Sequence, residues 1–187
     1  MSLKNLHIDA SWTLFLDRDG VINQRLPDDY VKSPDEFELI AGVAEAVMDL
    51  STRFGKIIVV SNQQGIGKGL MTESDLEMVH KKMFSLISNA GGKIDAVFFA
   101  SSLAHEQNIM RKPNIGMGLA ARKKFPEIRF KRSIMAGDSF GDVQFGKRLG
   151  MKTVLIGDDV NIAKLHPKLV DYHFADLHSF SKALVNS

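Results

Sequence analysis

Short apolar runs that alternate with segments of helical periodicity constrain the fold of this 187-residue chain more than any other feature. The runs are too short for helices and are rich in branched and aromatic residues, which is typical of buried strands. Five strands are expected over residues 12–16, 56–60, 94–100, 132–136 and 152–156, with an edge strand over 172–175. Helices are predicted over residues 42–54, 74–90, 115–125, 143–149 and 177–184.

Strands that alternate with helices predict an α/β fold. We expect a three-layer, Rossmann-like parallel sheet with helices on both faces. The length suits one domain over residues 1–187. In open α/β sheets, ligands bind beyond the carboxyl ends of the strands, so the residues that follow each strand are the candidate site.

The composition argues against several classes of function. The net charge of +2 gives no reason to expect binding to nucleic acid or to a membrane surface. The chain contains no cysteine, which excludes disulfides, thiolate metal sites and cysteine nucleophiles and is compatible with a reducing cytoplasm. No stretch approaches the ~20 apolar residues of a membrane span, and residues 1–11 do not resemble a signal peptide. We therefore expect a cytoplasmic monomer whose partner is a small molecule.

Chemically reactive side chains follow four of the expected strands. In chain order they are Asp17 and Asp19, then Ser61, Asn62 and Gln63, then Arg111 and Lys112, and finally Asp138 and Asp142. Because the carboxyl ends of parallel strands meet at one edge of a sheet, we expect these groups to converge.

This set of residue types suits phosphoryl transfer. Crowded carboxylates repel one another unless a cation lies between them, and Mg²⁺ is the hard cation that oxygen ligands fit best. The metal and a lysine can neutralise a phosphoryl group, while a hydroxyl and backbone N–H groups bind its remaining oxygens. One carboxylate can attack phosphorus, and a second can protonate the leaving oxygen and later deprotonate a water.

Taken alone, each motif has a plainer interpretation. A DxD sequence is usually a solvated turn, and GDxxxD is usually a loop that leads into a helix N-cap. The segment 65–69 is similar to the tail of a P-loop, but Asn62 stands where the first glycine belongs and Gly69 where Ser or Thr belongs. The ordered occurrence of the motifs at four successive strand ends is what favours a catalytic site.

The motifs resemble those of the haloacid dehalogenase superfamily of phosphohydrolases, in its histidinol-phosphatase and heptose-bisphosphate phosphatase branch. Asp17-Arg-Asp-Gly-Val-Ile-Asn23 is similar to the first motif, the segment 61–69 to the second, Arg111-Lys-Pro113 to the third, and Gly137-Asp138 with Asp142 to the fourth. The resemblance implies a Rossmann-like fold. The predicted elements fill the intervals from Asp17 to Ser61 and from Ser61 to Lys112, so we expect no large cap domain. The resemblance also implies a flap over about residues 21–37 and a substrate loop over about residues 101–113.

The resemblance implies a role for each matching residue. Asp17 would be the nucleophile and a metal ligand. Asp19 would be the general acid and base, and would offer its backbone carbonyl to the metal. Asp138 would be a further Mg²⁺ ligand, while Ser61 and Lys112 would hold the phosphoryl oxygens.

Other residues would act around this centre. Asp142 would orient Lys112 or a metal-bound water. The substrate beyond its phosphate would meet residues of the second and third motifs and of the flap, namely Asn62, Gln63, Arg111, Gln24, Arg25, Asp28, Asp29 and Tyr30. The leading substrate is D-glycero-D-manno-heptose 1,7-bisphosphate, with removal of the 7-phosphate, and histidinol phosphate is the alternative.

One segment departs from the family pattern. The heptose-bisphosphate branch carries a zinc loop of three cysteines and a histidine before the third motif. The matching positions here are Ala100, Ser102, Asn108 and Met110. With no cysteine and only His105 in this loop, a closed structural zinc site is excluded, and we expect packing and hydrogen bonds to hold the loop.

Two non-enzymatic functions remain as alternatives. A receiver domain also has a parallel sheet, an acidic metal site and a phosphorylated aspartate. Such domains need no second aspartate two residues later, so the pair Asp17 and Asp19 favours a hydrolase. A catalytically silent phosphate-binding or interaction module is the other alternative, and the presence of every catalytic residue argues against it.

Overall fold

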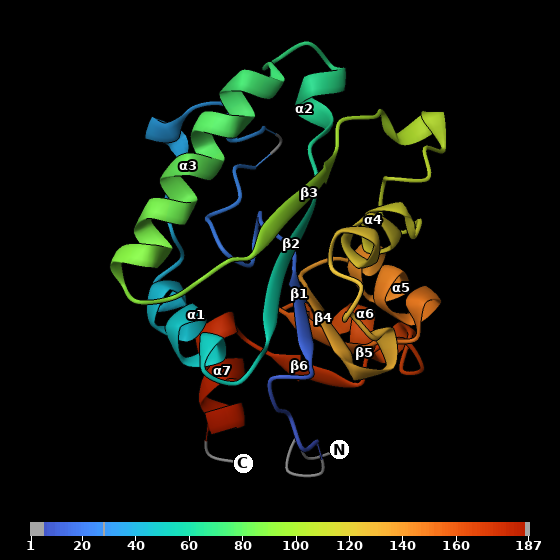
Figure 1. The fold of residues 1–187 in the computed structure, drawn as a ribbon. Helices are drawn as coiled ribbons and strands as arrows, with labels where there is room; N and C mark the ends of the chain where they lie inside the picture. Colours follow the sequence, from blue (N-terminus) through green and yellow to red (C-terminus); the bar gives the residue numbers. More distant parts are fainter. Residues whose placement is uncertain (1–5, 28, 186–187) are drawn as a thin grey trace.

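Six parallel strands form a single sheet in the order β3-β2-β1-β4-β5-β6 in the computed structural model, which describes residues 6–27 and 29–185 (Figure 1). The strands are β1 Thr13–Leu16, β2 Lys56–Asn62, β3 Ala96–Ala100, β4 Ser133–Gly137, β5 Lys152–Ile156 and β6 Tyr172–Phe174. The helices are α1 Val43–Ser51, α2 Gln64–Gly67, α3 Glu73–Asn89, α4 Gly116–Lys124, α5 Phe140–Leu149, α6 Val160–Leu165 and α7 Leu177–Val185. The described residues also form the 3₁₀ turns η2 Pro34–Glu36, η3 Ala104–Glu106 and η4 Phe130–Arg132. The predicted α/β fold with a parallel sheet is confirmed.

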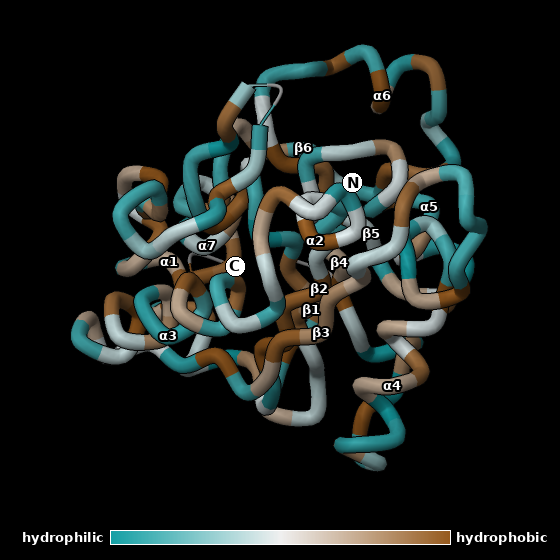
Figure 2. The backbone as a smooth tube through the Cα atoms, turned by 90° about the horizontal axis from the view of Figure 1, so that it is seen from above, coloured by the Kyte–Doolittle hydropathy of each residue, from teal (hydrophilic) through white to brown (hydrophobic). Residues whose placement is uncertain are grey.

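Helices cover both faces of the sheet because successive residues of each central strand point in opposite directions. Leu14 and Leu16 of β1 belong to the core cluster that α1, α3 and α7 cover. Phe15 belongs to a second cluster, which contains Met117 of α4 and Phe145 of α5. Figure 2 shows the hydrophobic residues gathered along the central strands. Burial on both faces explains the nearly continuous apolar runs in the sequence.

Several element boundaries differ from those expected. Strand β2 continues through Ser61 and Asn62 because both residues pair with β3. A short helix, α2, occupies the glycine-rich segment that was expected to be a turn, and α6 was not expected. Helix α5 begins at Phe140, earlier than predicted, because Ser139 caps its first turn.

The segment between β1 and α1 corresponds to the expected flap. Val21, Ile22, Val31 and Phe37 are buried in the larger core cluster. The base of the flap is thereby fixed to the body of the molecule, and the part between these anchors reaches the carboxyl ends of the strands. Within the residues that the structure describes, no helix has the length and apolar character needed to cross a membrane.

Candidate active site

A cavity of about 470 Å³ lies at the carboxyl ends of the central strands. The order of the strands reverses between β1 and β4, which is where open α/β sheets bind ligands. Most of the predicted site residues line this cavity, namely Asp17, Asp19, Arg25, Tyr30, Ser61, Asn62, Arg111, Lys112 and Asp138. Gln63 and Asp142 lie behind its wall. The expected convergence of the strand ends is therefore present.

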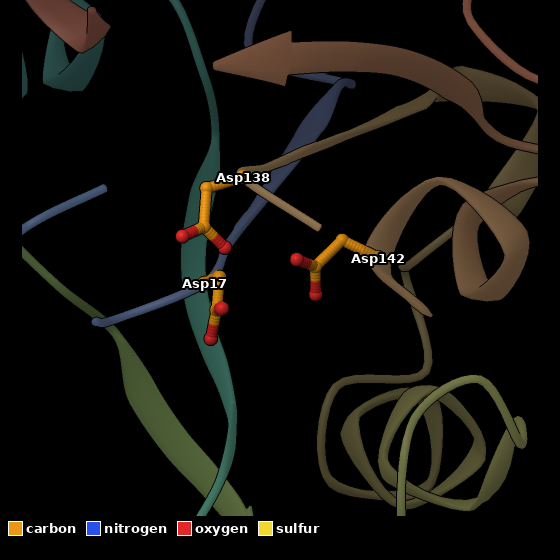
Figure 3. Close-up of side chains that lie close together, drawn as sticks. All are labelled: Asp17, Asp138 and Asp142. Atoms are coloured by element: carbon orange, nitrogen blue, oxygen red, sulfur yellow. The ribbon is translucent and has the colours of Figure 1, made fainter. Parts of the chain in front are cut away.

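Three carboxylates gather on one side of the cavity (Figure 3). Asp17, Asp138 and Asp142 each offer an oxygen, and these oxygens all lie within 4.8 Å of one another. Burial and the neighbouring Asp142 raise the pKa of Asp17 to about 7, and the same two causes raise the pKa of Asp138 to about 6. Asp17 and Asp138 thus resist ionisation without a nearby counter-charge, and oxygen ligands of this kind fit a hard divalent cation. The carboxylate of Asp142 belongs to this group, whereas that of Asp19 does not.

Lys112 supplies the positive charge of the site. Its Nζ lies 2.8 Å from Asp17 Oδ1 and 2.5 Å from Asp142 Oδ1, and it donates to the backbone carbonyl of Val60 at 2.7 Å. Although burial alone would lower the pKa of Lys112, the charges of Asp142 and Asp17 raise it. A protonated lysine is thus fixed beside the expected nucleophile.

The first turn of α5 fixes Asp142. Its Oδ2 accepts hydrogen bonds from the backbone N–H of Ser139 at 3.0 Å and from the Ser139 hydroxyl at 2.6 Å. Its other oxygen, Oδ1, meets Lys112. The GDxxxD motif is therefore a helix N-cap and part of the site at once. The predicted role of Asp142, the orientation of Lys112, fits these contacts and stays a prediction.

Asp19 points away from the acidic group toward Arg18, which is fully buried. Asp19 Oδ1 accepts hydrogen bonds from Arg18 Nη2 at 2.9 Å and from Asn23 Nδ2 at 3.0 Å, and Oδ2 accepts one from Gln63 Nε2 at 2.8 Å. Burial would raise the pKa of Asp19, but the charge of Arg18 and these hydrogen bonds lower it. In this arrangement, Asp19 is held as a carboxylate.

Gln63 does not occupy the position expected of a substrate contact. Its side chain is 1% exposed and donates hydrogen bonds to Asp19 and to Ser61 Oγ, the latter at 2.7 Å. The neighbouring Gln64 lines the cavity instead. The prediction for Gln63 is corrected because β2 extends to Asn62 and α2 begins at once, which turns the side chain of Gln63 inward.

Two glycines of the motifs are required by close approach. Gly20 has a φ of +86°, and a Cβ at this position would lie 2.2 Å from Asp138 Oδ2. A Cβ on Gly137 would lie 2.3 Å from the Cβ of Asp142. Any side chain at either position would push an acidic residue out of place.

Cationic side chains surround the cavity, and one of them was missed from the sequence. Lys68 lines the cavity, and its Nζ lies 5.2 Å from the centre of the Tyr30 ring. Arg25 contacts Asp138 Oδ2 at 3.2 Å, and Arg111 also lines the cavity. A single lysine in a glycine-rich segment gives no signal of its own, because its position depends on the flap that folds over it.

The other flap predictions have mixed outcomes. Asp29 lines the cavity and forms an ion pair with Lys32 at 2.5 Å. Gln24 is exposed and is not part of the cavity lining. Asp28 lies outside the described residues.

Hydrogen bonds hold the loop over residues 101–113, as expected. The backbone N–H of Ala104 donates to Gln64 Oε1 at 2.8 Å, and Arg111 Nη1 donates to the carbonyl of Ser102 at 3.3 Å. The side chain of Asn108 accepts from the backbone N–H of Met110 at 2.8 Å. These contacts connect the loop to α2 and place Arg111 at the cavity.

Comparison with protein families identifies the chain. The sequence model of the polynucleotide kinase 3 phosphatase family matches residues 13–180. The chain belongs to this family. The resemblance to haloacid dehalogenase phosphatases is confirmed, and the chain is a phosphatase of this superfamily.

Several relatives of this phosphatase are named as heptose-bisphosphate phosphatases. The D-glycero-alpha-D-manno-heptose-1,7-bisphosphate 7-phosphatase of Mycobacterium tuberculosis is 36% identical over 133 residues, which are 71% of this chain and 70% of the relative. The D-glycero-beta-D-manno-heptose-1,7-bisphosphate 7-phosphatase of Neisseria meningitidis is 36% identical over 143 residues, which are 76% and 75% of the two chains.

Solved structures that resemble this chain include phosphatases named for the same class of substrate. A D,D-heptose 1,7-bisphosphate phosphatase from B. bronchiseptica, in complex with magnesium and phosphate, superposes with a TM-score of 0.85 at 27% identity. The match covers 94% of this chain and 98% of that structure. The corresponding phosphatase from Burkholderia thailandensis has a TM-score of 0.68 at 28% identity and covers 94% and 99% of the two chains.

Proposed function

We propose that this phosphatase hydrolyses a phosphomonoester of a small phosphorylated sugar, with Mg²⁺, through an aspartyl-phosphate on Asp17. The most specific form of the proposal is removal of the 7-phosphate of D-glycero-D-manno-heptose 1,7-bisphosphate. The observation that carries it is the position of Asp17 beside Lys112 and next to the carboxylates of Asp138 and Asp142, at a cavity that Ser61 also lines. The relatives named for heptose bisphosphates support the substrate.

The residues at the cavity fit a Mg²⁺ ion. Asp17 and Asp138 would hold it, with Asp142 beside them and the backbone carbonyl of Asp19 as a further ligand. When bound, the ion neutralises charge on the phosphoryl group and on the carboxylates. The raised pKa values of Asp17 and Asp138 support this assignment, because only a cation makes two ionised carboxylates favourable here.

The side chains of the chain itself account for both steps of hydrolysis. In the first step, Asp19 must carry a proton taken up from solvent, which its lowered pKa makes the minor form of the free site. A carboxylate oxygen of Asp17 bonds to phosphorus, the bond from phosphorus to the sugar oxygen breaks, and this oxygen takes the proton from Asp19. In the second step, Asp19 removes a proton from water as the water oxygen bonds to phosphorus. The bond to Asp17 then breaks, which releases inorganic phosphate. Ser61 and Lys112 hold the phosphoryl oxygens throughout.

The cations at the cavity favour a bisphosphate. Lys68 and Arg111 line it in addition to Lys112 and to Arg25, which is paired with Asp138. Asp29, the exposed carboxylate among the lining residues, is paired with Lys32. A second phosphate on the substrate would be attracted to these cations. Histidinol phosphate carries an ammonium group at the corresponding end, and the same cations would repel it.

Phosphate release from a panel of metabolites, with Mg²⁺ and with EDTA, tests the proposal. The panel contains both anomers of heptose 1,7-bisphosphate, histidinol phosphate, hexose and nucleotide monophosphates, and an oligonucleotide with a 3′-phosphate. We expect strong turnover of one heptose bisphosphate that EDTA abolishes. Preference for another compound would show that the proposed substrate is wrong. Absence of all turnover in folded, Mg²⁺-loaded protein would favour a silent phosphate-binding module.

The organisation of the protein in solution is part of the proposal. We expect one domain over residues 1–187 that acts as a cytoplasmic monomer, with residues 21–37 as the flap and residues 101–113 as the substrate loop. The buried base of the flap and the hydrogen bonds from the loop to α2 support this division. Light scattering after size exclusion tests the monomer.

A further inference from the structure

Gln63 lies between two groups that the proposed mechanism uses for different tasks. Its Nε2 donates one hydrogen bond to Asp19 Oδ2 at 2.8 Å and another to Ser61 Oγ at 2.7 Å. Its Oε1 accepts a hydrogen bond from Arg18 Nη2 at 3.3 Å. The side chain is 1% exposed and is not part of the cavity lining, so Gln63 acts on other residues rather than on the substrate.

Arg18 fixes the orientation of the Gln63 amide. A guanidinium group only donates hydrogen bonds, and a carboxylate only accepts them. If the amide were rotated by half a turn, its NH₂ group would face Arg18 and its oxygen would face Asp19. Both contacts would be repulsive, so the orientation follows from the chemistry of the two neighbours.

The same orientation of the amide determines the direction in which the Ser61 hydroxyl can donate its hydrogen. A serine oxygen that accepts a hydrogen bond from Gln63 still has its own hydrogen to donate. Ser61 lines the cavity, so this hydrogen is available to a phosphoryl oxygen there. Without Gln63, the hydroxyl could rotate and donate its hydrogen to another acceptor.

We propose that Gln63 is a positioning residue that holds the Ser61 hydroxyl ready for the phosphoryl group and holds Asp19 beside it. The proposal rests on the function proposed above and adds a residue that couples phosphate binding to general acid catalysis. A merely structural Gln63 would satisfy buried polar groups but would have no selective effect on either task.

The choice of leaving group separates these two roles. An alkyl phosphate needs a proton from Asp19 as its P–O bond breaks, whereas p-nitrophenyl phosphate releases a stable anion without one. In Gln63→Met, which has a similar size but no amide, we expect kcat/KM for a sugar phosphate to fall about 100-fold, because general acid catalysis is weakened. We expect kcat/KM for p-nitrophenyl phosphate to fall about 10-fold or less, through Ser61 alone.

Equal losses for the two substrates, or no loss for either, would overturn the proposal. Gln144→Met is the matched control, since Gln144 is a half-buried glutamine of α5 outside the cavity lining, and it should leave both values unchanged. Thermal unfolding shows whether Gln63→Met is folded. If it is not, Gln63→Ala, which also removes the amide and is smaller, carries the same comparison.

Binding of inorganic phosphate in the presence of Mg²⁺, measured by calorimetry, tests the coupling to Ser61 without turnover. We expect Gln63→Met to weaken binding about 5-fold, the value of one hydrogen bond. In a Ser61→Ala background, the same substitution should cause little further loss, because both changes remove one interaction. Equal losses in the two backgrounds would contradict the coupling. If the wild-type protein bound phosphate but hydrolysed neither substrate, the proposed function would fail while this comparison still decided the coupling.

Discussion

Lys112 and Asp142 form a buried ion pair in which Nζ lies 2.5 Å from Oδ1 and the two side chains are 2% and 0% exposed. The capped first turn of α5 holds Asp142, and the backbone carbonyl of Val60 receives another hydrogen bond from Lys112. The lysine therefore has a fixed position next to Asp17. Both partners of such a pair are needed for stability, because a buried charge without its partner is strongly unfavourable.

Substitution of Lys112 by methionine should remove turnover and destabilise the protein. Three carboxylates would lose their nearby cation, and loss of one partner of a buried pair costs about 3–5 kcal/mol of the free energy of unfolding. Urea denaturation in EDTA measures this change. The double variant Lys112→Met/Asp142→Asn should be more stable than Lys112→Met alone, yet still inactive. If the two substitutions destabilised additively, the side chains would not act as a pair.

Asp17→Asn should abolish turnover and keep the fold. An amide oxygen is a poor nucleophile, so we expect phosphate release to fall by about 10⁴-fold or more, the scale of other nucleophile removals. The thermal unfolding temperature in EDTA should stay equal to that of the wild type or rise, because one of the mutually repelling carboxylates has gone. Normal activity in this variant would place the nucleophile elsewhere.

The sequence predicted the position of a site residue well where the end of a strand determines it. It predicted the position poorly where contacts between distant segments determine it. Strand β5 has the predicted bounds, and Asp17, Ser61 and Asp138 converge because parallel strands end at one edge. Whether Gln63 or Gln64 faces the cavity depends on the residue at which β2 ends, and the pairing of β2 with β3 determines that end.

Other features depend on contacts that no local pattern records. Lys68 reaches the cavity beside Tyr30, a residue of the flap far away in the chain. Helix α6 is short, with a cap from Asp159 but no buried face, so its periodicity gives little signal. Arg18 is fully buried and pairs with Asp19, an arrangement that a DRDG motif does not reveal by itself.

Mg²⁺ should stabilise the protein more at pH 8 than at pH 5. The pKa values of Asp17 and Asp138 are raised from 3.8 to about 7 and about 6. In this range the metal-free folded state binds more protons than the unfolded state, so the contribution of these groups to stability falls as the pH rises from about 4 to 7. A bound cation offsets this loss of stability because it compensates the charge of the two carboxylates. At pH 5 it must first displace protons from them.

Thermal unfolding with Mg²⁺ and with EDTA at the two pH values measures this difference. Asp138→Asn should reduce the Mg²⁺-dependent rise in unfolding temperature at pH 8. An equal rise at both pH values would show that the ion does not bind at these carboxylates.

Lys68→Met should impair a bisphosphate substrate more than a monophosphate. Lys68 lines the cavity, so loss of its charge should weaken the attraction for a second phosphate. We expect KM for heptose 1,7-bisphosphate to rise about 10-fold with kcat nearly unchanged, the scale of one charge-assisted hydrogen bond. Lys164→Met, on α6, is a control outside the cavity lining. The same rise for a hexose monophosphate would mean that Lys68 binds the transferred phosphate instead.

His80 should make the protein sensitive to mild acid. It lies on the buried face of α3, 8% exposed, and its Nε2 has no hydrogen-bond partner among the described residues. Burial, and then the charge of Arg18, lower the pKa of His80 from 6.5 to about 4. Protonation therefore favours the unfolded chain, and the stability that neutral His80 allows is lost as the pH falls from about 6.5 to 4.

His80→Met removes this titration and should flatten the pH dependence of unfolding. Across that range the wild type should lose up to about 3 kcal/mol of its free energy of unfolding relative to the variant, given 1.36 kcal/mol per pKa unit. Urea denaturation at pH 4.5 and pH 7 measures the difference, and the titration of Asp17 and Asp138 cancels because both proteins share it. His105→Met, at an exposed position, should leave the pH dependence unchanged. If His80→Met kept the full acid sensitivity, the buried imidazole would not be its source.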